Sequence, residues 1–192
     1  MPSILSEFEY DVFISYRHND NKYDGWVTED VDNLQKELEA TVKDLNHNPN
    51  LSKINAIKAI AILERKVKES PNDFRVYAAL GQARAFAGNY DQAIAAGKKA
   101  CEMMPVALDA FLDGVSMEQN LVTTYIVCGK YDLAMDKIEY LLTIPGVIEI
   151  GNEVSHEYNY SVPLLRVDPM LDNLRNLPRF KKILATEYKT VY

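Results

Sequence analysis

The segment between Pro71 and Pro105, which are 34 residues apart, constrains the fold more than any other part of the sequence. Apolar and small residues recur there with helical spacing on both sides of Gly88, a pattern typical of two helices joined by a tight turn. Small side chains let the two helices approach closely, larger ones fill the space between them, and Pro105 ends the second helix. The residues that define this unit are Tyr77, Leu80, Gly81, Gly88, Tyr90, Ala93, Ala100 and Pro105.

A partial copy of the unit follows, with Gly129 lying 41 residues after Gly88. The extra residues fall between 106 and 119, as either a lengthened helix or an added turn. Upstream, Ile54 to Ser70 matches only the second helix of such a unit, because Asn46 to Asn50 is a turn-rich break where the first helix would lie. The residues that define the copy are Leu121, Tyr125, Gly129, Tyr131 and Ala134.

A 34-residue period with this pattern resembles the tetratricopeptide repeat (TPR) family. The resemblance implies a mainly α-helical solenoid of antiparallel helix pairs within 52–145, namely a half repeat at 52–71 and full repeats at 72–105 and 106–145. Such repeats cannot bury their apolar faces alone, so we expect the amino-terminal helix and the segment 146–192 to cap the stack.

The carboxy-terminal tail has prolines where short helices are expected to start, at Pro169 and Pro178. From Leu165 to Phe180 it resembles the closing segment of bacterial TPR-bearing signalling proteins. The stretch from Gly146 to Tyr160 carries no clear pattern, and the sequence assigns it no structure.

In the TPR family, the first helix of each repeat lines a concave groove that binds an extended peptide or a helix. The resemblance therefore implies an interaction module with a protein or peptide partner, in bacterial signalling. The candidate surface is mixed and nearly uncharged, which argues against a clamp for a terminal carboxylate. The groove candidates are Arg75, Ala78, Gln82, Ala85, Phe86, Gln119, Asn120, Thr123 and Val127.

The amino-terminal segment, 1–45, has a different character. Tyr10 to Tyr16 reads as a buried strand, and Val27, Val31, Leu34, Leu38 and Val42 recur along one face of a helix. These elements resemble the start of a TIR (Toll/interleukin-1 receptor) domain, with Asp20 in the loop and Gly25-Trp26-Val27 opening the helix.

The resemblance covers one strand and one helix, whereas a nucleotide pocket in an open parallel sheet needs several strands. We therefore carry over no catalytic residue and expect a protein that is not an enzyme and has no cofactor. The alternative is a remnant or variant of a TIR-TPR signalling protein that hydrolyses NAD. Residues 1–45 are also a possible contact between copies of the chain.

Composition excludes further classes of function. The net charge of -7 disfavours nucleic acid as a partner, because that affinity depends on clustered cations. No apolar run approaches the roughly 20 residues that span a bilayer, and no signal peptide precedes Arg17, so we expect a cytoplasmic protein without a membrane partner.

The cysteines and histidines offer no clear chemical site. We expect Cys101 and Cys128 to pack in the interior rather than act as nucleophiles. We expect no metal site, because His18, His47 and His156 are far apart in the sequence.

Overall fold

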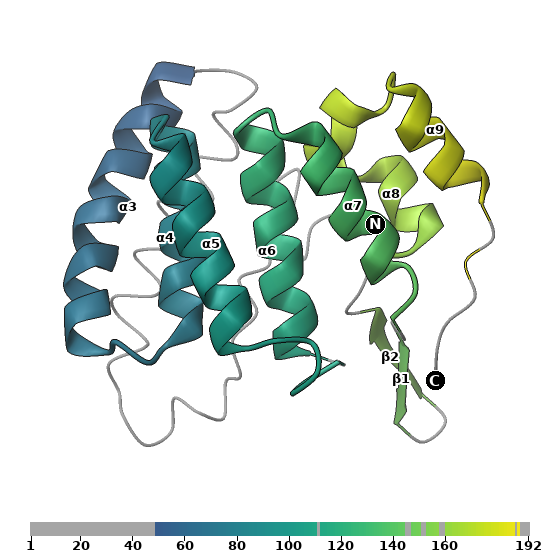
Figure 1. The fold of residues 1–192 in the computed structure, drawn as a ribbon, viewed down its shortest axis with the longest axis horizontal. Helices are drawn as coiled ribbons and strands as arrows, with labels where there is room; N and C mark the ends of the chain where they lie inside the picture. Colours follow the sequence, from purple (N-terminus) through teal and green to yellow (C-terminus); the bar gives the residue numbers. More distant parts are fainter. Residues whose placement is uncertain are drawn as a thin grey trace.

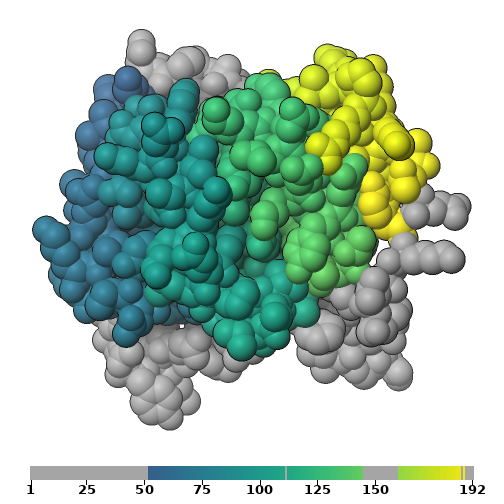
Figure 2. Space-filling model, viewed as in Figure 1, coloured from purple at the N-terminus to yellow at the C-terminus, as the bar shows by residue number. Residues whose placement is uncertain are grey.

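A computed structural model describes residues 49–110, 112–144, 147–150, 153–157, 160–186 and 188. These residues are mainly α-helical, as the sequence predicts. Helices α3 to α7 lie side by side in chain order, and the short helices after residue 160 pack against α6 and α7 (Figures 1 and 2). The predicted strand at 10–16 and the predicted helix from Val27 to Val42 lie outside the described residues.

The first helix pair consists of α4 (Phe74–Ala87) and α5 (Tyr90–Met103). Their close approach depends on Gly81. A methyl group on Gly81 would lie 3.0 Å from the backbone nitrogen of Gly97 and 3.1 Å from the carbonyl oxygen of Ala93. The two backbones therefore touch at a point where no side chain fits.

Most of the residues predicted to fill this pair are in place. Leu80 and Ala100 are buried, and Tyr77 packs in a cluster with Ala100. Tyr90 is different, because it stands in the first turn of α5 and is 47% exposed. The prediction that Tyr90 fills the space between the helices is wrong, since a side chain in the first turn leans back toward the connecting loop.

The same turn joins the helices of both pairs. Gly88 and Gly129 have φ angles of +90° and +68°, in the left-handed region that favours glycine. In each turn the glycine N–H donates to the carbonyl three residues earlier at 3.0 Å. The next N–H donates to the carbonyl five residues earlier at 2.8 Å. The sequence repeat thus has a counterpart in backbone hydrogen bonds.

The second pair consists of α6 (Asp113–Val127) and α7 (Tyr131–Leu141). Because α6 has 15 residues and α4 has 14, the extra residues between the pairs form turns rather than a longer helix. The carboxylate of Asp109 accepts hydrogen bonds from the N–H groups of Leu112 and Asp113, at 2.9 and 3.1 Å. These bonds satisfy donors at the start of α6.

Helix α3 (Pro49–Glu69) packs on α4 at one edge of the row (Figure 1). The sequence predicts a turn-rich break from Asn46 to Asn50. That prediction is wrong for Pro49 and Asn50, because both residues already belong to α3. Proline is well tolerated in a first helical turn, where its missing N–H has no partner to lose.

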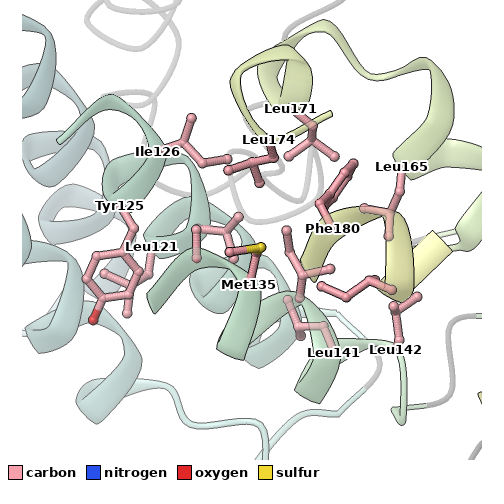
Figure 3. Packing of buried hydrophobic residues seen from close by; sticks show 14 of the residues in the cluster. Leu121, Tyr125, Ile126, Met135, Leu141, Leu142, Leu165, Leu171, Leu174 and Phe180 are labelled. Atoms are coloured by element: carbon pink, nitrogen blue, oxygen red, sulfur yellow. The ribbon is translucent and has the colours of Figure 1, made fainter. Parts of the chain in front are cut away.

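Three short elements follow residue 160, namely α8 (Val162–Val167), the 3₁₀ helix η1 (Pro169–Leu174) and α9 (Pro178–Ala185). The predicted helix starts at Pro169 and Pro178 are confirmed. Figure 3 shows the tail residues Leu165, Leu171, Leu174 and Phe180 facing side chains from α6 and α7 such as Ile126, Met135 and Leu141. All four tail residues are fully buried in one cluster with that helix pair.

Two polar residues order the tail. Asp168 accepts a hydrogen bond from the N–H of Met170 at 2.9 Å and caps η1. The guanidinium of Arg175 donates to the carbonyl oxygens of Leu165, Arg166 and Asp168, which lie at the end of α8. These contacts give Asp168 and Arg175 structural roles within the tail segment from Leu165 to Phe180.

A β-hairpin lies between α7 and α8, in the stretch to which the sequence assigned no structure. Strand β1 (Val147–Ile150) pairs antiparallel with β2 (Glu153–Glu157), with Ile150 opposite Glu153. Strands of four and five residues are too short for alternation to stand out. Within the described ranges no helix combines the length and the apolarity needed to cross a membrane.

Candidate partner-binding site

The predicted groove residues occupy the neighbouring helices α4 and α6, which are in contact. Seven of them are half-buried and form what is called here the α4/α6 face. This face comprises Arg75, Gln82 and Phe86 of α4 with Gln119, Asn120, Thr123 and Val127 of α6. Helical spacing places the members from each helix on one side of it.

The other two predicted groove residues do not belong to this face. Ala78 is 3% exposed and packs with Ala100 and Met117, and Ala85 is 2% exposed and packs with Ala93. Both methyl groups fill the space between the helices, so neither can touch a partner. The prediction of a partner contact is therefore wrong for Ala78 and Ala85.

A hydrogen bond joins the two helices across the α4/α6 face. The side-chain amide of Gln82 donates from Nε2 to Oδ1 of Asn120 at 2.8 Å. Two residues selected from the sequence as separate candidates, 38 positions apart, thus form one polar contact. The bond links α4 to α6, and it leaves further donor and acceptor capacity on both amides.

Arg75 is the cation among these residues, and Asp73 neutralises it. Asp73 caps α4 by accepting from the backbone N–H of Arg75 at 3.0 Å. It also accepts from Nε and Nη2 of the same guanidinium, each at 2.9 Å. A bidentate ion pair of this kind holds the guanidinium against the carboxylate, so the positive charge of Arg75 is neutralised. The α4/α6 face therefore presents amides, a hydroxyl and apolar groups with little net charge.

The other side of α6 borders a hollow of about 300 Å³ between α5 and α7. Glu118 is 8% exposed there, and Lys137 of α7 reaches its Oε2 with an Nζ distance of 2.7 Å. The residues that line the hollow are Lys98, Cys101, Glu102, Glu118, Leu121, Tyr125 and Lys137.

Protons in this hollow are tightly held. Burial, with the nearby charge of Glu118 and a hydrogen bond to it, raises the pKa of the Cys101 thiol to about 12. Burial also raises the pKa of Tyr125. Burial alone would lower the pKa of Lys137, but the hydrogen bond to Glu118 and its charge outweigh that effect, and the pKa is raised. At neutral pH these three groups keep their protons, so none of them is an activated nucleophile or base.

Sequence reasoning missed Glu118 and Lys137. A signal was present, because Glu118 lies among Val115, Leu121 and Val122 at the spacing of a buried helix face. A charged residue on such a face needs a partner, and the sequence alone did not identify Lys137 as that partner.

Comparison with protein-family models, with curated proteins and with solved structures finds no match to this chain.

Proposed function

We propose that the chain is a TPR-like scaffold that binds a peptide or helix of a signalling partner on the α4/α6 face. Its support is the repeated architecture, in which two helix pairs have the same glycine turn and contact each other through α4 and α6. A row of helix pairs presents equivalent side chains at regular intervals, which suits an extended ligand.

The single observation that carries the proposal is the hydrogen bond from Gln82 to Asn120. It joins two amides on adjacent helices beside the half-buried Phe86 and Thr123. Amides pair with the backbone of an extended peptide, and an aromatic ring accepts an apolar side chain, so the face combines the two kinds of contact that peptide recognition uses.

The charges of the face define the chemistry of the ligand. Since Asp73 neutralises Arg75, a strongly acidic tail would find no concentrated positive charge there. The partner segment is therefore one with few charges, which presents backbone amides and at least one apolar side chain.

The test is selection of binders from a displayed library of random peptides on the full chain, followed by affinity measurement of the enriched peptides. Phe86→Ala removes the ring, and Thr123→Arg places a long cation on the face. Each should weaken binding by about tenfold or more, which corresponds to ~1.4 kcal/mol. The matched control is Lys99→Ala, on the exposed side of α5.

Enriched peptides should carry few acidic residues and lose affinity for both face variants but not for the control. Peptides that bind all four proteins equally would remove the α4/α6 face from the proposal. Enrichment of acidic peptides would contradict the proposed ligand chemistry.

The alternative of NAD hydrolysis concerns the TIR-like stretch, 8–44, which lies outside the described residues. Incubation of the pure full chain with NAD tests it directly, because release of nicotinamide would require a catalytic site that the proposed scaffold does not need.

A further inference from the structure

The outer side of α3 carries an exposed apolar stripe with a lysine on each side of it. Ile54 and Ile57 are 51% and 54% exposed, and Ala61, one turn further along, is exposed as well. Helical spacing puts Lys53 on one side of this stripe and Lys58 on the other, and both lysines are exposed. These five residues are called here the outer patch of α3.

The outer patch is a different surface from the α4/α6 face. By its other side α3 contributes Ala59 and Leu63 to a buried cluster with Val76 and Leu80 of α4. Among the described helices α3 forms one edge of the row (Figures 1 and 2). What the outer patch binds is therefore independent of the peptide-binding function proposed above.

The two lysines of the outer patch have no acidic partner among the described residues. The glutamates of α3 are engaged by other cations. Glu64 pairs with Arg84 of α4 at 2.9 Å, and Glu69 pairs with Lys66 at 3.2 Å. Positive charge is thus left uncompensated at the outer patch, in a chain whose net charge is -7.

We propose that the outer patch of α3 docks an acidic amphipathic helix of a partner protein. The apolar residues of the patch recur at intervals of three and four, the spacing at which a second helix packs its own apolar stripe. From Ile54 to Ala61 the stripe extends about 11 Å, or two helical turns. The partner helix therefore needs an apolar stripe of similar length, with aspartates or glutamates on both sides that pair with the lysines.

Charge disfavours two other occupants of the outer patch. Two copies of the chain packed together through it would bring lysines against lysines, and like charges held close across an interface are costly. An anionic lipid surface is a poor fit, because segments that bind such lipids by charge carry clusters of ~4–8 cations, whereas the patch has two.

A designed peptide serves as the probe in a binding test on the full chain. An alanine-rich peptide of about 20 residues, long enough to be helical in water, carries leucines in one stripe and glutamates on both sides of it. A matched peptide has lysine in place of every glutamate. Fluorescence anisotropy of the labelled peptides measures their affinities. The glutamate peptide should bind, and the lysine peptide should not.

Two kinds of variant connect this binding to the outer patch. Ile57→Asp places a charge in the stripe and should weaken binding of the glutamate peptide by about tenfold or more. The matched control is Leu133→Asp, because Leu133 is 42% exposed and lies on α7. Lys53→Glu combined with Lys58→Glu should weaken the glutamate peptide to a similar extent and should make the lysine peptide bind instead.

This exchange of peptide preference, with the control variant unchanged, would support the proposal. Failure of the glutamate peptide to bind the unaltered chain would overturn it. So would equal binding of the two peptides, or equal affinity of Ile57→Asp and the control for the glutamate peptide.

Cysteine labelling shows whether the outer patch is open in the full chain. Ile57→Cys should react with a maleimide about as fast as Leu108→Cys, since Leu108 is 74% exposed. The native Cys101 and Cys128 react slowly because burial raises their pKa values.

Three results would assign the outer patch to another occupant, and each would overturn the proposal. Slow labelling of Ile57→Cys at high dilution would assign it to another part of the same chain. Labelling that slows as the protein concentration rises would assign it to a second copy. Cosedimentation with vesicles of anionic phospholipid that is lost in Ile57→Asp would assign it to a lipid surface.

Discussion

Glu118 of α6 and Lys137 of α7 form an ion pair of 2.7 Å in which the glutamate side chain is 10% exposed and the lysine side chain 32%. A charge so nearly buried is tolerated because its partner compensates for lost hydration. The pair ties together the two helices of the second pair, and the Cys101 thiol of α5 hydrogen-bonds to the same carboxylate.

The first prediction is that Lys137→Met destabilises the fold by about 1–3 kcal/mol. A fully buried pair broken on one side costs ~3–5 kcal/mol, and the partial exposure of Lys137 reduces that figure. Urea denaturation measures the loss. The double variant Glu118→Gln/Lys137→Met removes both charges and should be more stable than Lys137→Met; a double variant that is less stable would refute the account of an uncompensated carboxylate.

The second prediction concerns alkaline pH. Burial raises the pKa of the Cys101 thiol from 9.0 to about 12, and it also raises the pKa of Cys128. Above pH 9 the unfolded chain releases these protons while the folded chain keeps them. The contribution of Cys101 to stability is therefore fully present below pH 9 and is lost as the pH rises toward 12, by at most about 1.4 kcal/mol per pH unit. Cys128 contributes in the same direction.

Urea midpoints measured at neutral pH and at increasing alkaline pH would show this slope. Cys101→Ala removes one of the two thiols and should flatten the slope just above pH 9. An unchanged slope in that variant would mean that Cys101 ionises equally in both states.

The third prediction compares two glycines in helices. Alanine at Gly81 would place a methyl group against backbone atoms of α5, which can move only if the helices separate. Overpacking of this kind costs ~1–3 kcal/mol and outweighs the gain of ~0.5–1 kcal/mol from better helix propensity. Gly81→Ala should therefore lower the midpoint of thermal unfolding.

Gly97→Ala is the matched comparison. Its methyl group would lie 2.9 Å from Cδ1 of Leu121, the end of a flexible side chain that can rotate away. Gly97→Ala should thus cost less than Gly81→Ala. The opposite order would indicate that the contact between α5 and α6 is tighter than that between α4 and α5.

The fourth prediction separates apolar from ionic anchoring of the tail. Arg179 of α9 reaches Asp136 and Glu139 of α7 at 2.6 and 2.8 Å, but these carboxylates are exposed. Arg179→Ala should cost only about 0.2–1 kcal/mol, whereas Phe180→Ala, at a fully buried position, should cost ~3–5 kcal/mol.

Salt distinguishes the two effects. At roughly 1 M salt the Debye length shrinks to ~3 Å, so the effect of Arg179→Ala should largely vanish while that of Phe180→Ala remains. Urea midpoints at low and high salt measure both. A loss on Arg179→Ala that persists in high salt would point to packing of its aliphatic part instead.

Local signals in the sequence determined the elements of this protein. Gly88 and Gly129 end helices because the left-handed conformation favours glycine. Pro169 and Pro178 start helices because the backbone N–H that proline lacks would have no partner in a first turn. Helical spacing around these residues identified both helix pairs. The same kind of signal failed for the β-hairpin between α7 and α8, whose strands are too short to show a period.

Tertiary structure alone decided which of these residues meet and which remain accessible. Gln82 bonds to Asn120 and Glu118 pairs with Lys137 because the packing of the helices brings together positions far apart in the chain. The same packing buries Ala78 and Ala85, which the resemblance to the TPR family assigns to the groove. Spacing within one helix defines a face, but only the neighbouring helices determine whether that face is covered.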